Sequence, residues 1–544
     1  MSSSNQHKNH SKSIPLDGIK GLVQNWKSDM MSGFLVFLLA LPLSLGIAKA
    51  SEFPPAMGVL TAMIGGLLVS FFAGSRLTIK GPAAGLITIC AGGVIAMSEL
   101  GGGDKTEGWH LILGAAVVAA LIQIGFGLLK FGSLSDFFPH SAVHGMLAAI
   151  GILIFAKQFP VLLGVDPSMT KGMTPIQLYE HIPNFIANAN GSIATIGLLS
   201  LLIMFILPAM GGVFKKIPAP MIVLLIAVPM AAYMGLSSVH DHSGKPFSLV
   251  KIGDFWGTLG FNASFAAIGT LTFWKFVFMF LFVNTIESLL TVKAIDGMDP
   301  YKRKSDYNKD LVAVGVGNAF SGLLGGLPMI SEVARSSANV NNGGKTRWAN
   351  FFHGFFLLIA MLAMIPVIEM IPNAALAAML IFVAYRLASP KEFIGTYKIG
   401  AEQLAIFLVT IIVTVAEDLL LGVAAGILTK LIIQVVNGAP LRSLFKARYT
   451  MKEHGKHIDI QIHDAAIFSN FLGYKKLWET IPGGHHLTFD FSDCVFVDHS
   501  FMEQLHLFEE EYHSTGGEIK VVGLENFNPF SSHPAAARKK VSHT

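Results

Sequence analysis

Charged residues and cysteines are both scarce in this chain of 544 residues. Only 14% of the residues are charged and 52% are hydrophobic, a balance that excludes a soluble enzyme of this length. The two cysteines, Cys90 and Cys494, stand far apart, so neither a disulfide framework nor a cysteine-based metal site is expected. The formal net charge is +4, which gives no indication of a nucleic-acid partner. We therefore expect neither a catalytic site nor a bound metal.

Long apolar runs fill most of the chain. Residues 1–28 contain no apolar stretch that ends in a cleavage site, so they are interpreted as a retained cytoplasmic tail. Runs of about 20 apolar residues then recur, as is typical of membrane helices. About fourteen spans, two of them short half-helices, make residues 29–437 a helical membrane domain that lies in lipid. The predicted spans are Asp29–Ala50, Met57–Ala73, Gly81–Met97, His110–Leu129, Ala142–Leu163, Ile193–Met210, Ile217–Gly235, Leu271–Thr291, Leu311–Leu324, Met329–Asn339, Ala349–Ile371, Ala374–Arg386, Leu404–Val415 and Leu419–Val436.

Lysine and arginine gather on one side of these spans. With the N-terminus inside, about 15 of them fall in inner loops and about 6 in outer loops. The inner set is Arg76, Lys80, Lys130, Lys215, Lys216, Lys293, Lys302, Arg303, Lys304, Lys309, Lys345, Arg347, Arg386, Lys391 and Lys398. The outer set is Lys49, Lys105, Lys157, Lys171, Lys245 and Lys251. This bias supports an even number of spans, both termini in the cytoplasm and a location in the cell inner membrane.

Two apolar segments are interrupted by glycine and proline, one in each half of the chain. The first is TIKGPAAGLITI (Thr78–Ile89) and the second is FSGLLGGLPMISEVARSSANVNNGGKT (Phe320–Thr346). Their prolines, Pro82 and Pro328, are about 246 residues apart, and long apolar spans recur at a similar offset. Short interrupted segments at matching places in two halves of a membrane protein are typical of a transporter's substrate site.

The composition changes after Val436. Residues 438–452 are interpreted as a basic linker that follows a Gly-Ala-Pro break. Next, His457–Phe468 and His486–Asp498 have strand-like patterns, Phe501–Tyr512 is amphipathic at helical spacing, and Glu518–Gly523 is a further strand. These patterns predict a small cytoplasmic α/β domain over residues 453–525 and a disordered tail over residues 526–544.

Five stretches together resemble the SulP family of inorganic anion transporters, which carry a C-terminal STAS domain. They are ALPLSLGIA after Asp29, KGPAAG, NTIESLLTVKA, GLPMISEVARSSANVNNGGKT and AEDLLLGVAAGI. The resemblance covers Leu16–Glu525 and implies two inverted repeats of seven spans, divided into a core and a gate domain. It also implies a small anion such as sulfate, bicarbonate, chloride or oxalate as substrate, Na⁺ or H⁺ as the coupling ion, and a homodimer.

An anion at the middle of the bilayer needs groups that replace its water. The N-terminus of a half-helix offers unpaired N–H groups and a partial charge of roughly +0.5. Pro82 fits the first turn of one half-helix and Pro328 precedes the other. The alternative is that the small residues here only allow helices to pack closely. The predicted substrate-binding residues are Lys80, Gly81, Pro82, Ala83, Ala84, Ser331, Glu332, Val333, Ala334, Arg335 and Ser336.

Glu287 lies inside the apolar run VNTIESLLTV, where a carboxylate is costly and is functional by default. Thr291 follows one turn later on the same face of a helix. The resemblance places this pair where relatives hold a sodium ion or carry a titrating acid, so both are predicted as coupling-ion residues. The alternative is a salt bridge from Glu287 to Lys80 or Arg335 that only stabilises the fold.

Two basic residues belong to the same segments. Arg335 stands where some family members place an arginine beside the anion, although it could instead pair with Glu332 at i, i+3. Lys80 departs from the family, which has a small residue before Gly-Pro. It either points into the cavity and compensates Glu287, or extends to the inner surface. The fixed charges of Lys80, Arg335, Glu287 and Glu332 sum to about zero, so they do not choose between sulfate and bicarbonate.

The predicted C-terminal domain carries two further candidates, Asp498 and Ser500. They form either a turn at the end of a strand or, by a loose match to the phosphorylated loop of soluble STAS proteins, a regulatory site.

The leading hypothesis for function is a secondary-active anion transporter that works by alternating access. The alternatives are an uncoupled anion channel or exchanger, a membrane-anchored STAS scaffold, and a nucleobase transporter of similar fold. The paired interrupted segments and the buried carboxylate argue against the scaffold, and the STAS domain with Arg335 argues against the nucleobase transporter.

Overall fold

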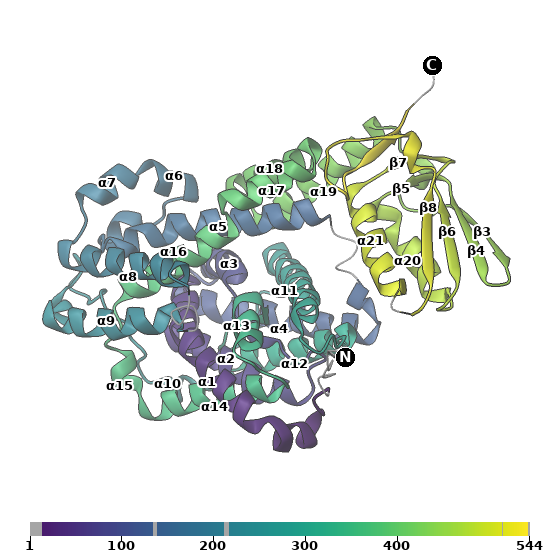
Figure 1. Cartoon of the computed structure of the whole chain (residues 1–544). Coiled ribbons are helices and arrows are strands. Elements are labelled where there is room, and N and C mark those ends of the chain that lie inside the picture. Colours follow the sequence, from purple (N-terminus) through teal and green to yellow (C-terminus); the bar gives the residue numbers. More distant parts are fainter. Residues whose placement is uncertain (1–13, 134–138, 212–216, 514, 542–544) are drawn as a thin grey trace, which may run out of the picture. The chain divides into compact units, whose positions relative to one another are not determined.

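The computed structural model describes residues 14–133, 139–211, 217–513 and 515–541, and it divides into two compact units (Figure 1). The predictions made for residues 1–13, for Lys215 and Lys216 and for residues 542–544 lie outside the described residues. The first unit is Met1–Gly132, Lys157–Gly172 and His181–Phe382, and the second is Ser133–Ala156, Met173–Glu180 and Val383–Thr544. Each unit is described by itself.

The first unit is helical, with one ribbon of two short strands. Its helices are α1 (Gly18–Ala50), α2 (Pro55–Leu67), α3 (Ile87–Leu100), α4 (Lys105–Leu128), α7 (Ile182–Ala187), α8 (Gly191–Ala209), α9 (Ala219–Tyr233), α10 (Phe255–Thr258), α11 (Leu271–Met298), α12 (Tyr307–Leu323), α13 (Val333–Asn341), α14 (Trp348–Ala363) and α15 (Ile365–Ile368). The ribbon consists of β1 (Ile79–Pro82) and β2 (Met329–Glu332), and a 3₁₀ turn, η2 (Ala84–Leu86), follows β1. Two helices, α5 (His140–Leu162) and α16 (Asn373–Leu387), have residues in both units.

The predicted spans lie on helices, with a strand and a helix at each of the two interrupted segments, and the span Ala349–Ile371 covers both α14 and α15. Within the described residues, seven helices are long and apolar enough to cross a membrane, and shorter apolar helices accompany them. Residues 18–28 of the predicted tail are helical, because α1 begins at Gly18. Asp17 accepts a hydrogen bond from Gly18 N at 2.8 Å, and the polar residues that follow, such as Lys20 and Gln24, are good helix formers.

The first unit repeats one order of elements. A long helix, a second helix, a short strand and an interrupted helix follow one another as α1, α2, β1, α3 and again as α11, α12, β2, α13. The two strands pair antiparallel, as expected for repeats of opposite orientation. The predicted helical membrane fold with paired interrupted segments is therefore confirmed.

The second unit joins membrane helices to an α/β domain. Its helices are α6 (Pro175–Glu180), α17 (Pro390–Ile399), α18 (Ala401–Ala416), α19 (Leu419–Val436), α20 (Phe471–Thr480) and α21 (His499–His513). Its strands are β3 (Tyr449–His454), β4 (His457–Ile462), β5 (Asp464–Ala466), β6 (His486–Asp490), β7 (Cys494–Val497), β8 (Glu518–Val522), β9 (Phe527–Pro529) and β10 (Arg538–Lys540). One sheet has the order β3-β4-β6-β8, with β4, β6 and β8 parallel, and the other has the order β5-β7-β10-β9.

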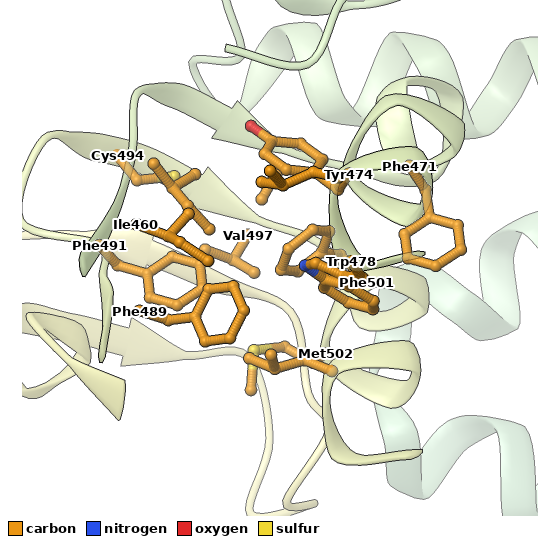
Figure 2. Packing of buried hydrophobic residues seen from close by; sticks show 14 of the residues in the cluster. Ile460, Phe471, Tyr474, Trp478, Phe489, Phe491, Cys494, Val497, Phe501 and Met502 are labelled. Carbon is orange, nitrogen blue, oxygen red and sulfur yellow. The ribbon is translucent and has the colours of Figure 1, made fainter. Parts of the chain in front are cut away.

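An aromatic core lies between α20, α21 and the first of these sheets, as Figure 2 shows. Phe489 and Phe501 are fully buried, and the Trp478 ring packs on Phe489 and Phe501 with centroids 6.0 and 5.9 Å apart. Cys494 is buried in the same core, and burial raises the pKa of its thiol to about 12, so the thiol stays protonated. The alternating apolar residues of the sequence thus form the core of the α/β domain.

Three predictions for this domain are wrong. The pattern at His457–Phe468 is split between β4 and β5, because Asp464 has a positive φ of 61° that ends the first strand. The predicted linker over 438–452 already contains the start of β3. The tail over 526–544 is ordered through residue 541, because β10 pairs with both β7 and β9 and thus satisfies its backbone groups.

Candidate functional site

The two interrupted segments meet as an antiparallel ribbon in the first unit. Ile79 pairs with Glu332 and Pro82 pairs with Met329. Because the strands run in opposite directions, the helices α3 and α13 start from opposite ends of a ribbon about 10 Å long. Pro82 therefore lies at the end of β1 and not in the first turn of a helix as predicted, whereas Pro328 precedes β2.

A buried ion pair fastens the ribbon to α12. Lys80 Nζ lies 3.0 Å from Asp310 Oδ1 and also bonds Thr78, and the side chains of Lys80 and Asp310 are 0% and 1% exposed. Asp310 also accepts hydrogen bonds from the N–H groups of Gly74 and Ser75 and from Ser331 Oγ, at 3.1, 3.0 and 3.1 Å. Both alternatives predicted for Lys80 are therefore wrong: it neither compensates Glu287 nor extends to the surface.

Side chains from neighbouring helices bind the backbone of the ribbon. Met329 N donates to Asn318 Oδ1 at 2.5 Å, and Lys80 N donates to Asn350 Oδ1 at 3.2 Å. The predicted hydroxyl donors are used here as well. Ser331 Oγ donates to Asp310, and Ser336 Oγ donates to Glu332 O at 2.5 Å. Because a hydroxyl has one proton to donate, neither serine can bind an anion without losing its internal bond.

The N-terminus of α13 is capped by the side-chain carboxylate of Glu332. Glu332 Oε1 accepts from Ala334 N at 3.2 Å, and Glu332 Oε2 accepts from Arg335 N at 2.7 Å. An acidic side chain at this position satisfies the free N–H groups and the helix dipole together. Two of the N–H groups predicted to face an anion are thus occupied, and the Val333 side chain is 46% exposed.

The start of α3 is open by comparison. Ala83 is extended, and the turn from Ala84 to Leu86 then leads into the helix. Within the described residues, no side chain caps either the turn or the first turn of α3. This end of the ribbon therefore keeps the unpaired N–H groups and the positive end of the helix dipole.

Arg335 reaches from α13 to this open end. Its side chain is fully buried, and Nη2 donates to the carbonyl oxygen of Pro82 at 3.1 Å. Its Nε lies 3.9 Å from Glu332, too far for a hydrogen bond, and Nε and Nη1 have no hydrogen-bond partner in the described structure. The guanidinium packs so tightly on Gly81 that a Cβ at this position would overlap Nη1. Arg335 thus presents two free donors beside the open helix.

Glu287 lies against the far end of the same turn, at Gly85. Its carboxylate packs against Gly85, where a Cβ would overlap both oxygens. Oε1 is buried without a hydrogen-bond partner among the described residues, and so is the side-chain oxygen of Asn284 one turn earlier. The alternative of a structural salt bridge is not observed, because Lys80 pairs with Asp310 and Arg335 lies nearest to Glu332. Thr291 is buried one turn beyond Glu287, and its role in binding a coupling ion stays a prediction.

The turn from Gly81 to Gly85 thus packs against a guanidinium at Gly81 and against a carboxylate at Gly85. Donors that lack partners suit a small oxyanion, and an unpaired carboxylate in a membrane interior needs a proton or a metal cation. The arrangement can therefore hold an anion near Gly81 and a cation near Gly85.

Sequence reasoning missed the groups that hold the ribbon. Asp310 stands directly before an apolar span predicted from Leu311, and an acid at such a position is a signal that was available. Asn318 and Asn350 gave no comparable signal, because polar amides inside apolar runs occur for several reasons.

The C-terminal candidates lie in the second unit. Asp498 forms the predicted turn between β7 and α21, and its Oδ1 accepts from Phe501 N at 2.8 Å. Its Oδ2 accepts from Gln434 of α19 at 2.8 Å and lies 3.3 Å from Lys430 Nζ, which donates to Ser500 Oγ at 2.7 Å. A regulatory role for Asp498 and Ser500 stays a prediction.

Comparison with known proteins gives consistent matches. A family model described as the sulfate permease family matches residues 26–410. YvdB of Bacillus subtilis (strain 168) is 27% identical over 413 residues, which cover 75% of this chain and 73% of that protein. Bicarbonate transporter BicA of Picosynechococcus sp. is 24% identical over 429 residues, covering 77% and 72%. High affinity sulfate transporter 2 of Stylosanthes hamata is 24% identical over 530 residues, covering 90% and 77%.

Solved structures show the same fold. The transmembrane domain of a cyanobacterial bicarbonate transporter, BicA, matches with a TM-score of 0.63 at 22% identity, over 74% of this chain and 98% of that one. SLC26A9 matches with a TM-score of 0.64 at 17% identity, over 92% of this chain and 85% of that one. The C-terminal α/β region is consistent with a STAS domain.

Proposed function

Because this chain belongs to the sulfate permease family, we propose that it is a secondary-active transporter of a small inorganic oxyanion, sulfate or bicarbonate, across the cytoplasmic membrane. Relatives named as a bicarbonate transporter and as a high affinity sulfate transporter support both substrates. The observation that carries the proposal is the turn from Gly81 to Gly85, which packs against Arg335, with its free donors, at Gly81 and against the unpaired carboxylate of Glu287 at Gly85.

The anion binds at the open start of α3. There the unpaired N–H groups of the turn and the Nε and Nη1 donors of Arg335 replace its water. The charged N–H groups of a guanidinium form strong hydrogen bonds to the oxygens of sulfate or bicarbonate, whereas a spherical halide has no such oxygens. The start of α13 contributes less, because Glu332 already occupies it.

The local charge favours cotransport with a cation. Lys80 and Asp310 cancel each other, which leaves Arg335 against Glu332 and Glu287. An ionised Glu287 therefore makes the site negative before any anion enters, and a charge in the membrane interior is costly. A proton or Na⁺ at Glu287 removes this charge, so that cation and anion bind more tightly together than alone. Thr291 and the side-chain oxygen of Asn284 are oxygen ligands of the kind that Na⁺ would need.

The anion then crosses by alternating access, in which one group of helices moves past another around the bound ions. The resemblance to the family also supports a homodimer with cytoplasmic termini, in which the α/β domain contributes to assembly. The basic residues on the predicted inner side, among them Arg303 and Lys304, support that orientation.

Isotope uptake into proteoliposomes tests this proposal. Labelled sulfate and labelled bicarbonate are offered separately, each under an inward Na⁺ gradient, an inward proton gradient or no cation gradient. We expect one of the two anions to accumulate above its equilibrium level with one of the cation gradients, and protein-free liposomes to show none. Flux that follows only the anion gradient would indicate a channel, and no flux of either anion would favour the scaffold.

A further inference from the structure

His353 is a buried histidine of α14 without a hydrogen-bond partner. It is 0% exposed, and neither Nδ1 nor Nε2 has a partner among the described residues. One turn earlier on the same face, by contrast, Asn350 donates to the carbonyl oxygen of Gly65 and to Ser70 Oγ. A buried imidazole without partners is costly, because its N–H group and its free nitrogen have both lost their bonds to water. The ring therefore points to a ligand that binds beside it.

At the level of His353, α14 packs closely on two helices. A Cβ on Gly33 of α1 would clash with the backbone nitrogen of His353, and a Cβ on Gly66 of α2 would clash with the backbone oxygen of Asn350. Asn350 also accepts a hydrogen bond from Lys80 N of β1 at 3.2 Å. The buried face of α14 that carries His353 is thus turned toward α1, α2 and the ribbon.

One face of α2 leads from α14 to Gly81 of the ribbon. Ala62 lies one turn before Gly66, and its methyl group is 3.5 Å from the position that a Cβ on Gly81 would take. Arg335 Nη1 lies at this same position, and the charge of Arg335 acts on His353. Both Nε and Nη1 of Arg335 lack partners in the described structure. Two side chains with free nitrogens therefore border the same region beside Gly81.

The other charged residues near His353 are held elsewhere. Lys80 stays in its buried ion pair, and Glu332 caps α13. In α1, Asp29 accepts hydrogen bonds from two backbone N–H groups just before α14, at 2.7 and 3.1 Å. Neither α2 nor α14 has a charged residue. A proton on His353 would thus meet the charge of Arg335 and the charge of whatever binds beside the two side chains.

The two candidate anions differ in charge. Burial beside a guanidinium favours the neutral imidazole while no anion is present. Bicarbonate brings one negative charge and sulfate brings two, and negative charge near the ring favours the imidazolium. One proton on His353 therefore gives the site with sulfate the same net charge as the site with bicarbonate. This proton lowers the cost of the second negative charge in the membrane interior.

We propose that His353 is a specificity-determining residue of the anion site. A ring nitrogen donates to the anion beside Arg335, and the ring takes up one proton from water when the anion is sulfate. With bicarbonate the ring stays neutral and donates through its single N–H group. The proposal rests on the anion site proposed at the turn from Gly81 to Gly85, and it is separate from the role of Glu287 as the coupling acid.

Calorimetric titration of the purified full-length protein tests this inference. Sulfate and bicarbonate are titrated separately into the Glu287→Gln variant, which lacks the other acid of the site, in two buffers that differ in ionisation enthalpy. The difference between the two buffers counts the protons taken up with each anion. We expect about one proton per sulfate and none per bicarbonate. Because this proton binds together with sulfate, the sulfate affinity should fall by about 10-fold for each unit of rising pH.

His353→Gln in the same background keeps a hydrogen-bond donor but cannot take up the proton. We expect its sulfate affinity to lose the dependence on pH and to fall about 10-fold at acidic pH, while its bicarbonate affinity changes less than about 3-fold. His240→Gln is the matched control, because it makes the same change at an exposed histidine of the same unit. It should keep the proton uptake of its parent.

Three results would overturn the inference. The first is sulfate binding without proton uptake in the Glu287→Gln protein, a measurement that does not depend on whether His353→Gln folds. The second is unchanged proton uptake in His353→Gln, and the third is a wild type that binds bicarbonate but not sulfate. Binding of neither anion by the wild type would refute the proposed function itself, and this inference with it.

Discussion

The buried pair of Lys80 and Asp310 gives the sharpest prediction from the structure. Asp310→Asn removes the charge that Lys80 faces and leaves a buried ammonium without the carboxylate that balances it. Breaking a buried pair in this way is expected to lower the free energy of unfolding by about 3–5 kcal/mol. Lys80→Met should cost less, about 1–3 kcal/mol, because Asp310 keeps its bonds from Gly74, Ser75 and Ser331.

The double variant separates the pair from its surroundings. With both charges removed, Asp310→Asn should cost less in the Lys80→Met protein than in the wild type, by about 2 kcal/mol or more. Unfolding of the detergent-solubilised protein in increasing dodecyl sulfate measures these free energies, and isotope binding measures the anion affinity. We expect Lys80→Met to retain that affinity within about 2-fold, because its Nζ is fixed on Asp310.

Two results would refute this reasoning. Additive costs in the double variant would show that the two charges do not stabilise each other. A folded Lys80→Met protein that no longer binds the anion would show that Lys80 belongs to the substrate site.

Three further predictions address the site and the C-terminal domain. Gly85→Ala should abolish uptake while expression persists, because its Cβ would displace the Glu287 carboxylate. Gly92→Ala in α3, the helix that follows this turn, should leave uptake unchanged, because a Cβ there meets no atom within 4 Å; equal uptake by both variants would contradict the geometry. Arg335→Gln should weaken sulfate or bicarbonate binding at least 10-fold and chloride binding less, as measured by competition, since charged hydrogen bonds contribute about 1.5–3 kcal/mol; equal losses would argue against oxyanion recognition. Truncation after Glu525 should lower the melting temperature of the α/β domain, because it removes β9 and β10 from their sheet, and an unchanged melting curve would show that these strands contribute no stability.

The membrane helices could be predicted because their signal is local. Each span is a run of apolar residues whose length alone distinguishes it, and the two interruptions are marked by Gly-Pro and Gly-Leu-Pro. The early start of α1 was missed, because hydropathy says nothing about polar residues that continue a helix beyond the bilayer.

The partners of the charged residues could not be predicted from local patterns. Lys80 and Asp310 are 230 positions apart, and their contact depends on the register of a ribbon whose strands are as distant. The sequence indicated that Glu287 and Arg335 are costly inside a membrane and are therefore functional candidates. It did not indicate that the Glu332 side chain caps the start of α13, whereas no side chain caps the start of α3 in the described residues. That asymmetry comes from tertiary packing and identifies the start of α3 as the more available end.

The same limit applies to the C-terminal tail. Its polar composition predicted disorder, whereas β10 is ordered by hydrogen bonds to a strand about forty positions earlier. Composition indicates how much apolar surface a segment can bury. A strand that pairs with an existing sheet needs little apolar surface of its own, because backbone hydrogen bonds hold it in place.

Concentrative uptake by Glu287→Gln tests the coupled anion site most directly. The variant and the wild type are compared in proteoliposomes under imposed Na⁺ and proton gradients, with Glu99→Gln, an exposed carboxylate at the other end of α3, as the matched control. The account predicts that Glu287→Gln still binds and exchanges the anion but no longer accumulates it above equilibrium, whereas Glu99→Gln behaves as the wild type. Accumulation by Glu287→Gln at the rate and level of the wild type would contradict it.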